Sequence, residues 1–511
     1  MSALDALVIN PGGRALTYQS LGNELTAIEP PLWSRLITGY LLNRDASVDI
    51  LDTEALHISP EVAAVEVAKR APRLAIIVVY GHQPSASTQT MMAARQLGRA
   101  IKAVAPDIPL LIVGGHVAAL PERTVQEEPI DFACNGEGPE TAWQLIQYLN
   151  GEKESLQQVA GLVWMEQQQV YQNPAPPLIT DLDKELHGNV WHLLPMEQYR
   201  AHNWQCFGEL STRKPYASIY TTLGCPYKCV FCCINAPFNA NKYRCRRPEA
   251  VVDEIEMLYT QYGVKTFKII DEMFVLKKNH YLKICELLAD KPFASELNIW
   301  AYARVDTVRE DTLALLRKAG IRWLALGIES ADETVRDGAN KSLSSQDIID
   351  IVKMIQAADI SVIGNFIFGL PHDTHESMRK TLDLAIALQC EFINFYSAMA
   401  YPGSGLYQQA LTHHWPLPTD WDGYSQHSYH CLPLPTDALT APDVLAFRDQ
   451  AFHEYFEHKG YLAFVEQKFG IETRQHIEEM SETRLKRFIV EDAAINPQHY
   501  VTAKGIQVVS Q

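Results

Sequence analysis

Short apolar runs alternate with segments of helical periodicity in the first part of the chain. The apolar runs lie at 6–10, 48–51, 74–80 and 110–113. Residues 32–42 instead place apolar side chains three and four positions apart, which is the spacing of a helix with one buried face. Apolar strands that alternate with helices are typical of a parallel sheet covered on both faces. We therefore predict an α/β fold that begins with a doubly wound, Rossmann-like domain at 1–150.

Glycine-rich loops follow the predicted strands of this domain, at 10–13, 80–88, 114–116 and 135–138. The carboxyl ends of parallel strands meet at one edge of a sheet, where ligands bind. Glycine there lets the backbone approach a ligand closely. Four such loops on one edge favour a cofactor site over four simple turns. Two alternatives stay open, a degenerate domain that binds nothing and a nucleotide-binding domain. The second is weakened because no Gly-x-Gly-x-x-Gly sequence follows the first strand.

A second α/β unit begins near residue 216. Its apolar strands lie at 217–222, 266–270, 299–304, 323–328, 362–368 and 393–398, with helical patterns between them. Six strand–helix repeats predict a partial, open (βα)6 barrel of the TIM type at 216–410. The pattern stops after six repeats, which argues against the closed eight-repeat barrel. Active sites in such barrels lie at the carboxyl ends of the strands.

The segments around this barrel have other patterns. Residues 151–215 read as a connector with a small hairpin and a proline-rich linker. Residues 411–511 carry helical patterns at 443–458 and 474–490, which predicts a mostly helical C-terminal subdomain. Aromatic and histidine side chains of this subdomain either cap the barrel or pack in its core: Trp421, Tyr424, His427, Tyr429 and His430.

Composition and charge exclude several classes of protein. Hydrophobic residues make up 47% and charged residues 21% of the 511-residue chain, as in globular proteins. No apolar run is long enough to cross a bilayer and no secretory signal is evident, so we expect no transmembrane segment and a cytoplasmic location. The net charge of −17, from 44 Lys plus Arg against 61 Asp plus Glu, argues against a nucleic-acid partner.

Three of the ten cysteines, Cys225, Cys229 and Cys232, share one loop after the first barrel strand. Without an export signal, clustered cysteines indicate metal ligands before disulfides. The spacing C-x3-C-x2-C supplies three thiolates, so one iron of a cubane cluster stays open for another ligand. Structural zinc prefers two such pairs, and no second pair follows at that spacing, although Cys245 is nearby. Cys233 adjoins Cys232 and is expected to be non-ligating.

The C-x3-C-x2-C loop, with the aromatic Phe231 before its last cysteine, resembles the radical S-adenosylmethionine (SAM) superfamily. The resemblance covers 216–402 and implies a [4Fe–4S] cluster that cleaves SAM to a 5′-deoxyadenosyl radical. It also implies SAM contacts at the strand ends, where a carboxylate suits an ammonium or ribose group and an arginine suits a carboxylate. Structural ion pairs are the alternative for these side chains. The residues concerned are Phe231, Asp271, Glu272, Arg304, Glu329, Ser330, Asn365 and Tyr401.

The first domain resembles the cobalamin-binding domain that precedes many radical SAM barrels, through the segments 80–88, 113–122 and 131–141. The resemblance implies cobalamin contacts from Gly12, Gly13, His82, Ser85, Ser87, Thr88, Gly114, Gly115, His116, Gly136 and Glu137. One departure matters, because residues 11–20 lack the Asp-x-His-x-x-Gly sequence whose histidine ligates cobalt. We therefore expect no ligand from that motif, and a lower cobalt face that is open or water-bound.

Together the two resemblances imply a cobalamin-dependent radical SAM methyltransferase. Its expected target is an unactivated carbon, or a phosphorus, of a small-molecule or lipid-like metabolite. The expected redox partner is an external one-electron reductant of the flavodoxin or ferredoxin type. Two other functions stay open, a cyclase or rearrangement enzyme that transfers no methyl group, and a non-enzymatic iron–sulfur or cobalamin sensor. The sequence identifies neither the substrate nor the oligomeric state.

Overall fold

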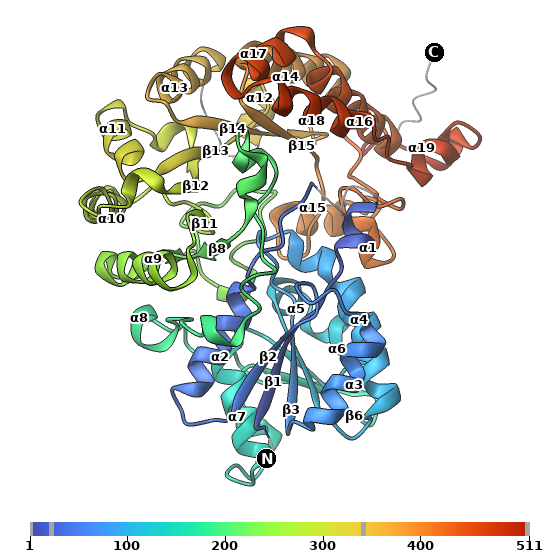
Figure 1. Ribbon diagram of the computed structural model, residues 1–511. Coiled ribbons are helices and arrows are strands. Elements are labelled where there is room, and N and C mark those ends of the chain that lie inside the picture. The colour runs from blue at the N-terminus through green and yellow to red at the C-terminus, as the bar shows by residue number, and fades with distance from the viewer. Residues whose placement is uncertain (1–3, 20–24, 339–343, 506–511) are drawn as a thin grey trace.

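The computed structural model describes residues 4–19, 25–338 and 344–505. Its first sheet has seven strands in the order β2-β1-β3-β4-β5-β6-β7 (Figure 1). The strands are β1 (Ala6–Asn10), β2 (Val48–Asp52), β3 (Leu74–Val78), β4 (Leu110–Val113), β5 (Phe132–Cys134), β6 (Leu162–Glu166) and β7 (Gln169–Gln172). Strands β1 to β5 run parallel, whereas the hairpin β6–β7, in the segment predicted as a connector, pairs antiparallel with β5 and extends this sheet.

Both faces of this sheet are covered by helices. Ala6 and Val8 of β1 are buried in the core formed with α2 (Leu32–Leu42) and α7 (Pro139–Leu149). The alternating residues Leu7 and Ile9 are buried in the opposite core, with α3 (Pro60–Arg70) and α4 (Ala86–Val104). Successive strand residues point to opposite faces, so burial on both faces requires strands that are apolar throughout. The shorter helices are α1 (Arg14–Tyr18), α5 (Gly115–Ala119) and α6 (Pro121–Glu127).

The second sheet is a curled row of six parallel strands in the order β15-β14-β13-β12-β11-β8, above the first domain in Figure 1. The strands are β8 (Tyr216–Ile219), β11 (Thr266–Ile269), β12 (Asn298–Arg304), β13 (Ile321–Glu329), β14 (Ser361–Phe368) and β15 (Phe392–Ser397). Its helices are α9 (Pro248–Tyr262), α10 (Lys278–Ala289), α11 (Glu310–Lys318), α12 (Glu333–Gly338), α13 (Ser345–Ala357) and α14 (His375–Leu388). Within the described residues no pairing joins β8 to β15, so the barrel is open, as predicted.

The C-terminal part is helical. It contains α15 (Gly405–His413), α16 (Ala441–Phe456), α17 (Lys459–Phe469), α18 (Ile471–Ser481) and α19 (Phe488–Ala493). Helix α16 packs against β15 and α14, so it closes the edge of the barrel core. The pattern predicted as one helix at 474–490 is two helices, α18 and α19. None of the helices in the described ranges combines the length and the apolar character that a membrane span requires.

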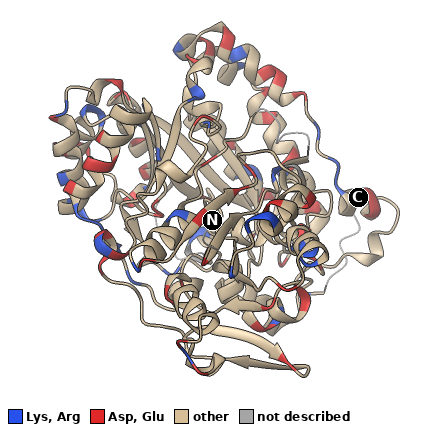
Figure 2. Cartoon of the chain, turned by 60° about the horizontal axis from the view of Figure 1, so that its bottom comes forward, with Lys and Arg blue, Asp and Glu red and all other residues tan. Residues whose placement is uncertain are grey.

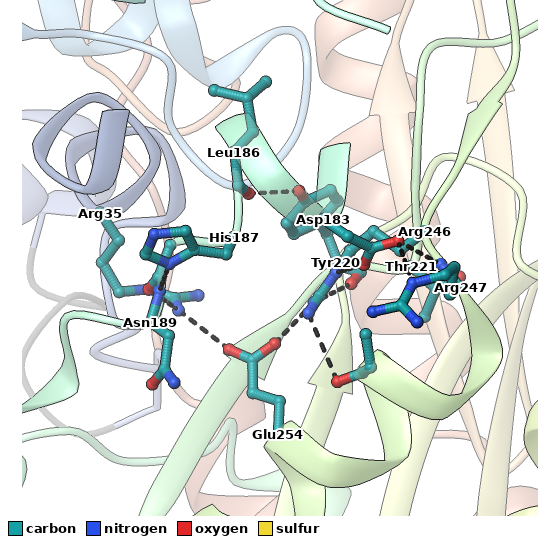
Figure 3. Close-up of polar contacts among 12 residues, drawn as sticks. Arg35, Asp183, Leu186, His187, Asn189, Tyr220, Thr221, Arg246, Arg247 and Glu254 are labelled. Atoms are coloured by element: carbon teal, nitrogen blue, oxygen red, sulfur yellow. Dashed lines mark hydrogen bonds and ion pairs between the residues drawn. The ribbon is translucent and has the colours of Figure 1, made fainter. Parts of the chain in front are cut away.

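Charged residues of both signs are interspersed over helices and loops in the view of Figure 2. A buried ionic cluster joins the first domain to the barrel (Figure 3). Arg35 of α2 lies 3.4 Å from Glu254 of α9 and donates to the carbonyl oxygens of Gly188 and Ser218. Arg246 makes the second contact to Glu254, at 2.6 Å. The cluster therefore fixes α2, the connector and the barrel relative to one another.

Candidate active site

The cysteine loop follows the short strand β9 (Thr222–Leu223) at the carboxyl end of the barrel. The side-chain amide of Asn235 holds its first turn, donating to the carbonyl of Cys225 at 3.0 Å and accepting from the Cys225 amide at 3.3 Å. The Cys232 amide donates to the Cys229 carbonyl at 3.1 Å. All three side chains line one cavity of about 270 Å³, and Cys233 lines it too.

The arrangement of these thiols fits a cluster better than a single metal ion. In the described ranges, no group of three or more His, Cys, Asp or Glu side chains converges on a point where one metal ion could bind. A cubane cluster makes no such demand, because each thiolate binds a different iron. The donor set of Cys225, Cys229 and Cys232 therefore suits a [4Fe–4S] cluster with one iron left open.

Six of the eight residues that the sequence assigned to SAM line the same cavity: Phe231, Glu272, Arg304, Glu329, Asn365 and Tyr401. The other two, Asp271 and Ser330, do not line it. Asp271 is buried and accepts hydrogen bonds from the backbone of Thr221, at 2.6 Å, and from the hydroxyl of Thr222, at 2.8 Å. Ser330 lies 3.1 Å from the hydroxyl of Thr381. Both have structural partners that turn them away from the cavity.

Glu272 and Arg304 bring a carboxyl group and a guanidinium group to this cavity, and a cation bound beside Glu272 would favour its ionised form. Burial raises the pKa of the Glu272 carboxyl to about 8, against the lowering effect of Lys268. Arg304 pairs with Asp306 at 2.8 Å and lies over the ring of Tyr227, and its Nη1 is 3.9 Å from Sγ of Cys229. A ligand with both an ammonium and a carboxylate would find one partner for each.

The ends of β13 and β14 shape the cavity wall. Glu329 has a φ of 67°, and the pairing of β13 with β14 is irregular between Gly327 and Glu329. A left-handed residue at a register shift redirects the end of a strand, and here the side chain of Glu329 lines the cavity. Asn365 donates to the carbonyl of Leu326 at 3.1 Å and accepts from Asn394 at 3.0 Å, so its amide is held in one orientation.

A second cavity of about 340 Å³ lies between the first domain and the barrel. Gly12, Gly13 and His82 line it from the strand ends of the first domain, and barrel residues such as Lys268 and Trp300 line it from the other side. Gln83, Tyr302 and Tyr396 line both cavities. The two cavities are therefore neighbours that share one wall.

The other residues predicted to bind cobalamin are distributed around this edge. Ser85 lines the first cavity, whereas Gly136 and Glu137 line a separate small pocket beyond β5. Ser87, Thr88 and His116 are buried beneath the loops. The Ser87 hydroxyl accepts from the His116 amide at 2.8 Å, and Thr88 Oγ1 is 3.1 Å from His116 Nδ1. Burial lowers the pKa of His116 to about 3, so this imidazole is neutral.

Two glycines at the strand ends of the first domain, Gly13 and Gly114, stand where a side chain would not fit. A Cβ on Gly13 would lie 2.9 Å from Cβ of Ala93, and one on Gly114 would lie 2.8 Å from the carbonyl oxygen of Val79. A Cβ on Gly115 would instead make ordinary contacts, 3.7 Å or more from Ser87 and Pro237. Gly13 and Gly114 are therefore required by close packing within the protein, and it is Gly12 and Gly13 that also line the second cavity, where a bound cobalamin would meet backbone.

Sequence reasoning missed several residues of the second cavity, among them Glu29, His202 and Lys268. Lys268 Nζ lies 3.1 Å from Glu29, although the two residues are 239 positions apart. A lysine inside the apolar run Thr266–Ile269 could have indicated a functional or paired side chain, because buried strands rarely carry an isolated charge. Glu29 and His202 lie in segments without a pattern, so nothing in the sequence distinguished them.

Two family models match the chain, the B12 binding domain over residues 18–146 and the Radical SAM superfamily over residues 219–385. An uncharacterized methyltransferase of Pyrococcus horikoshii is 30% identical over 342 residues, which is 67% of this chain and 71% of that protein. The anaerobic magnesium-protoporphyrin IX monomethyl ester cyclase of Cereibacter sphaeroides is 25% identical over 434 residues, which is 84% of this chain and 67% of that protein.

A solved structure has the same fold. It is the radical S-adenosylmethionine methyltransferase TsrM from Kitasatospora setae, with cobalamin and a [4Fe–4S] cluster bound. The TM-score is 0.62 at 20% identity, with 80% of this chain and 79% of that chain covered. At this identity the likeness concerns the fold, and it supports the predicted order of an α/β domain, a partial barrel and a helical C-terminal part.

Proposed function

The chain belongs to the cobalamin-dependent radical SAM family, and on that premise we propose that it methylates an unactivated carbon, or a phosphorus, of a small-molecule or lipid-like metabolite. The predicted family and fold class are confirmed. The protein is an enzyme of this family, with a [4Fe–4S] cluster, SAM and cobalamin as its cofactors. The identity of the substrate and the residues that bind each cofactor are parts of the proposal.

One observation carries the proposal, the shared wall between the two cavities. Cys225, Cys229 and Cys232 open onto the first cavity, and the glycine-lined edge of the B12-binding domain opens onto the second. Tyr302 and Tyr396 line both. A substrate held at this wall would be within reach of both cofactors, as the transfer of a methyl group to a substrate radical requires.

We propose that the three cysteines hold the cluster and that Glu272, Arg304 and Asn365 orient SAM. When bound, the cluster supplies the electron that cleaves SAM, and cobalamin carries the methyl group. The Glu272 carboxylate would accept from the SAM ammonium, and Arg304 would face its carboxylate. The expected electron source is an external flavodoxin- or ferredoxin-type reductant.

Side chains of the C-terminal part close the same space. Gln426 lines the first cavity, donates to the carbonyl of Ser397 at 2.8 Å and accepts from the Ser397 amide at 3.0 Å. It therefore fixes the end of β15. The aromatic ring of Phe452 from α16 lines the second cavity together with Trp300 and Phe395 of the barrel, and these apolar surfaces would help to exclude water when the cofactors are bound. A dry cavity protects a radical from side reactions.

The methyl-transfer step has a competitor, because one similar protein is a cyclase. The test is anaerobic incubation of the reconstituted enzyme with dithionite and SAM, followed by quantification of 5′-deoxyadenosine and S-adenosylhomocysteine. A methyltransferase is expected to give both products, because reduced cobalamin takes the methyl group of one SAM, yielding up to one S-adenosylhomocysteine per bound cobalamin, and another SAM is cleaved to 5′-deoxyadenosine. 5′-Deoxyadenosine without S-adenosylhomocysteine would favour cyclisation or rearrangement. Neither product from a fully loaded enzyme would contradict both functions. Cys229→Ala serves as the inactive control.

A further inference from the structure

A buried arginine, Arg448 of α16, lies beside β15, the last strand of the open barrel. Helix α16 packs against this strand, and Nε of Arg448 donates to the backbone carbonyl of Phe395 at 2.8 Å. The Arg448 side chain is 7% exposed. Arg448 lines the second cavity, as do Phe452, one turn further along α16, and Asn394 and Tyr396 of β15. Arg448 therefore brings a positive charge to the barrel side of this cavity.

The carboxylates that line the second cavity are already paired with other cations. Apart from histidines, the charged side chains that line it in the described ranges are Arg14, Glu29, Glu54, Lys268 and Arg448. Arg14 pairs with Glu54 at 3.2 Å, and Lys268 pairs with Glu29 at 3.1 Å. Each of the two carboxylates thus has its own cation. None of the described carboxylates that line the cavity is left to pair with Arg448.

Outside the cavity lining, Arg448 shares one carboxylate with a second buried arginine. Arg487 is 3% exposed and donates to both oxygens of Asp449, at 2.7 and 3.0 Å. Nη1 of Arg448 donates to one of the same oxygens at 2.8 Å. Burial raises the pKa of Asp449 and the two arginines lower it, with a net shift downward, so the carboxylate is ionised. Two guanidinium groups therefore face one carboxylate, and this group of three residues has an excess positive charge.

The Arg448 guanidinium also has more hydrogen-bond donors than acceptors. Arginine carries five N–H groups. Its acceptors in the part of the chain that the structure describes are the Phe395 carbonyl, Asp449 and His427, whose Nε2 is 3.5 Å from Nη2. Burial lowers the pKa of His427 well below its ordinary value, with a further effect of Arg448 and Arg487, so this imidazole is neutral. Because His427 lines the cavity too, Nη2 lies on the cavity side.

The surface around Arg448 is largely aromatic. The ring centroid of Phe452 is 5.8 Å from the guanidinium carbon, and Phe392 and Trp300 line the same cavity. Tyr396 lines both cavities. Burial raises the pKa of Tyr396, and Arg448 is close enough to act against that rise. A ligand with its anionic group on Arg448 would therefore lie along an aromatic surface and reach the shared wall at Tyr396.

We propose that Arg448 binds an anionic group of the substrate, a carboxylate or a phosphate, and that the rest of the substrate is an apolar or aromatic body. The inference rests on the proposed function and narrows its substrate class to such amphipathic anions. A guanidinium suits both groups, because it presents several N–H donors in one plane to their oxygens. The bound anion would also balance the excess charge of Arg448, Arg487 and Asp449.

The test is anaerobic isothermal titration calorimetry of the full-length protein, loaded with cobalamin and the cluster. The probes are 2-naphthylacetate, 2-naphthyl phosphate and the neutral 2-naphthylacetamide. The wild type should bind at least one anion more tightly than the amide, and the tighter anion identifies a carboxylate or a phosphate site. Arg448→Gln should weaken binding of that anion by about tenfold or more and leave the amide unchanged, because charge-assisted hydrogen bonds are lost. Arg448→Lys, which keeps the charge, should retain part of the affinity for the anion.

Arg484→Gln is the matched control, since Arg484 belongs to the same C-terminal part but pairs with Glu457 at the surface, and it should bind the probes as the wild type does. Equal affinity of the wild type for the anions and the amide would overturn the proposal without any variant. Equal affinity of the wild type and Arg448→Gln for the anions would overturn it as well.

Two further results separate this inference from other assignments. Loss of cobalamin from Arg448→Gln, in a variant that unfolds at the same temperature as the wild type, would assign the guanidinium to the phosphate of the cofactor and overturn the substrate site. Wild-type protein that cleaves SAM but binds neither anion would overturn the site and leave the proposed function intact. Anion binding that depends on Arg448, in a loaded protein that cleaves no SAM, would support the site and contradict the proposed function.

Discussion

Arg35 of the first domain and Glu254 of the barrel form a buried ion pair, 3.4 Å apart, in which both side chains are at most 5% exposed. The guanidinium of Arg35 also lies over the ring of Trp191, 3.7 Å from its centroid, and Glu254 accepts from the Trp191 indole at 3.0 Å. Burial and Arg246 act on the pKa of Glu254 in opposite directions, and its net shift is downward, so the carboxylate is ionised. The two domains are therefore joined by charges that are removed from water.

Glu254→Gln should strongly destabilise the protein, because it leaves the guanidinium groups of Arg35 and Arg246 buried without a carboxylate. Removal of one partner from a buried ion pair costs about 3–5 kcal/mol. Glu256 lies on the same helix and pairs with Lys291 at the surface, where an exposed pair contributes about 0–1 kcal/mol. Glu256→Gln is therefore the control, and urea unfolding of both variants is the measurement. Equal midpoints for the two variants would contradict the structural role of Glu254.

Cys229→Ala should lose the iron–sulfur cluster, because two thiolates from one loop are a poor ligand set for a cubane. The expected result is the loss of nearly all bound iron and sulfide after anaerobic reconstitution, with the loss of the visible absorption of the cluster. Cys285 is fully buried in α10, away from the cavity, and Cys285→Ala should keep its iron. Iron retention in Cys229→Ala equal to that in Cys285→Ala would refute the assignment. Cys233→Ala should also retain iron if that thiol is non-ligating.

His116 should make the protein sensitive to acid. Its pKa is lowered by burial from 6.5 to about 3, so between these values the unfolded chain binds a proton that the folded chain does not. The stability linked to His116 is thus complete above about pH 6.5 and is lost as the pH falls toward 3. His116→Asn, which can keep a hydrogen bond to Thr88, should flatten this part of the stability profile. His192 is exposed, so His192→Asn should leave the profile as in the wild type.

Two adjacent glycines should respond differently to the same substitution. Gly114→Ala would bring a Cβ to 2.8 Å from the backbone carbonyl of Val79, and overpacking of this kind costs about 1–3 kcal/mol. Gly115→Ala would meet its nearest atoms at 3.7 Å, so we expect a change within about 0.5 kcal/mol. The two glycines are adjacent in the chain, so Gly115→Ala serves as the control for Gly114→Ala. Similar thermal unfolding midpoints for the two variants would contradict this prediction, because they would show that the backbone at Gly114 shifts to accommodate the extra methyl group.

Elements with a strong local pattern were predictable from the sequence. Residues 32–42 form the predicted helix α2, and β14 begins one residue before its predicted start at 362. The prediction of one helix at 474–490 was wrong because periodicity alone does not reveal a break. The residues between α18 and α19 are not helical. The cysteine loop and six SAM candidates line one cavity because strand ends of a parallel sheet share an edge.

The sequence could not predict which way adjacent side chains point, nor which residues far apart in the chain come into contact. Asp271 and Glu272 are neighbours at the end of β11, yet one is buried against Thr221 and the other lines the cavity. Adjacent residues point to opposite sides of an extended chain, and the sequence does not say which side is inside. Lys268 and Glu29 meet across 239 positions, a separation at which no periodic pattern carries information.

The buried ionic cluster of Arg35, Arg246 and Glu254 also restricts how the domains of this protein could be exchanged with those of other proteins. A first domain moved onto a foreign barrel would carry the Arg35 guanidinium into a site without Glu254 or the carbonyls of Gly188 and Ser218. The reverse exchange would leave Glu254 facing only Arg246. The first chimera would bury an unpaired charge, and the second would lose one of the two guanidinium partners of Glu254. The B12-binding domain and its barrel are therefore a matched pair in this protein, and an exchange of either domain would have to carry the partners of Arg35 and Glu254 with it.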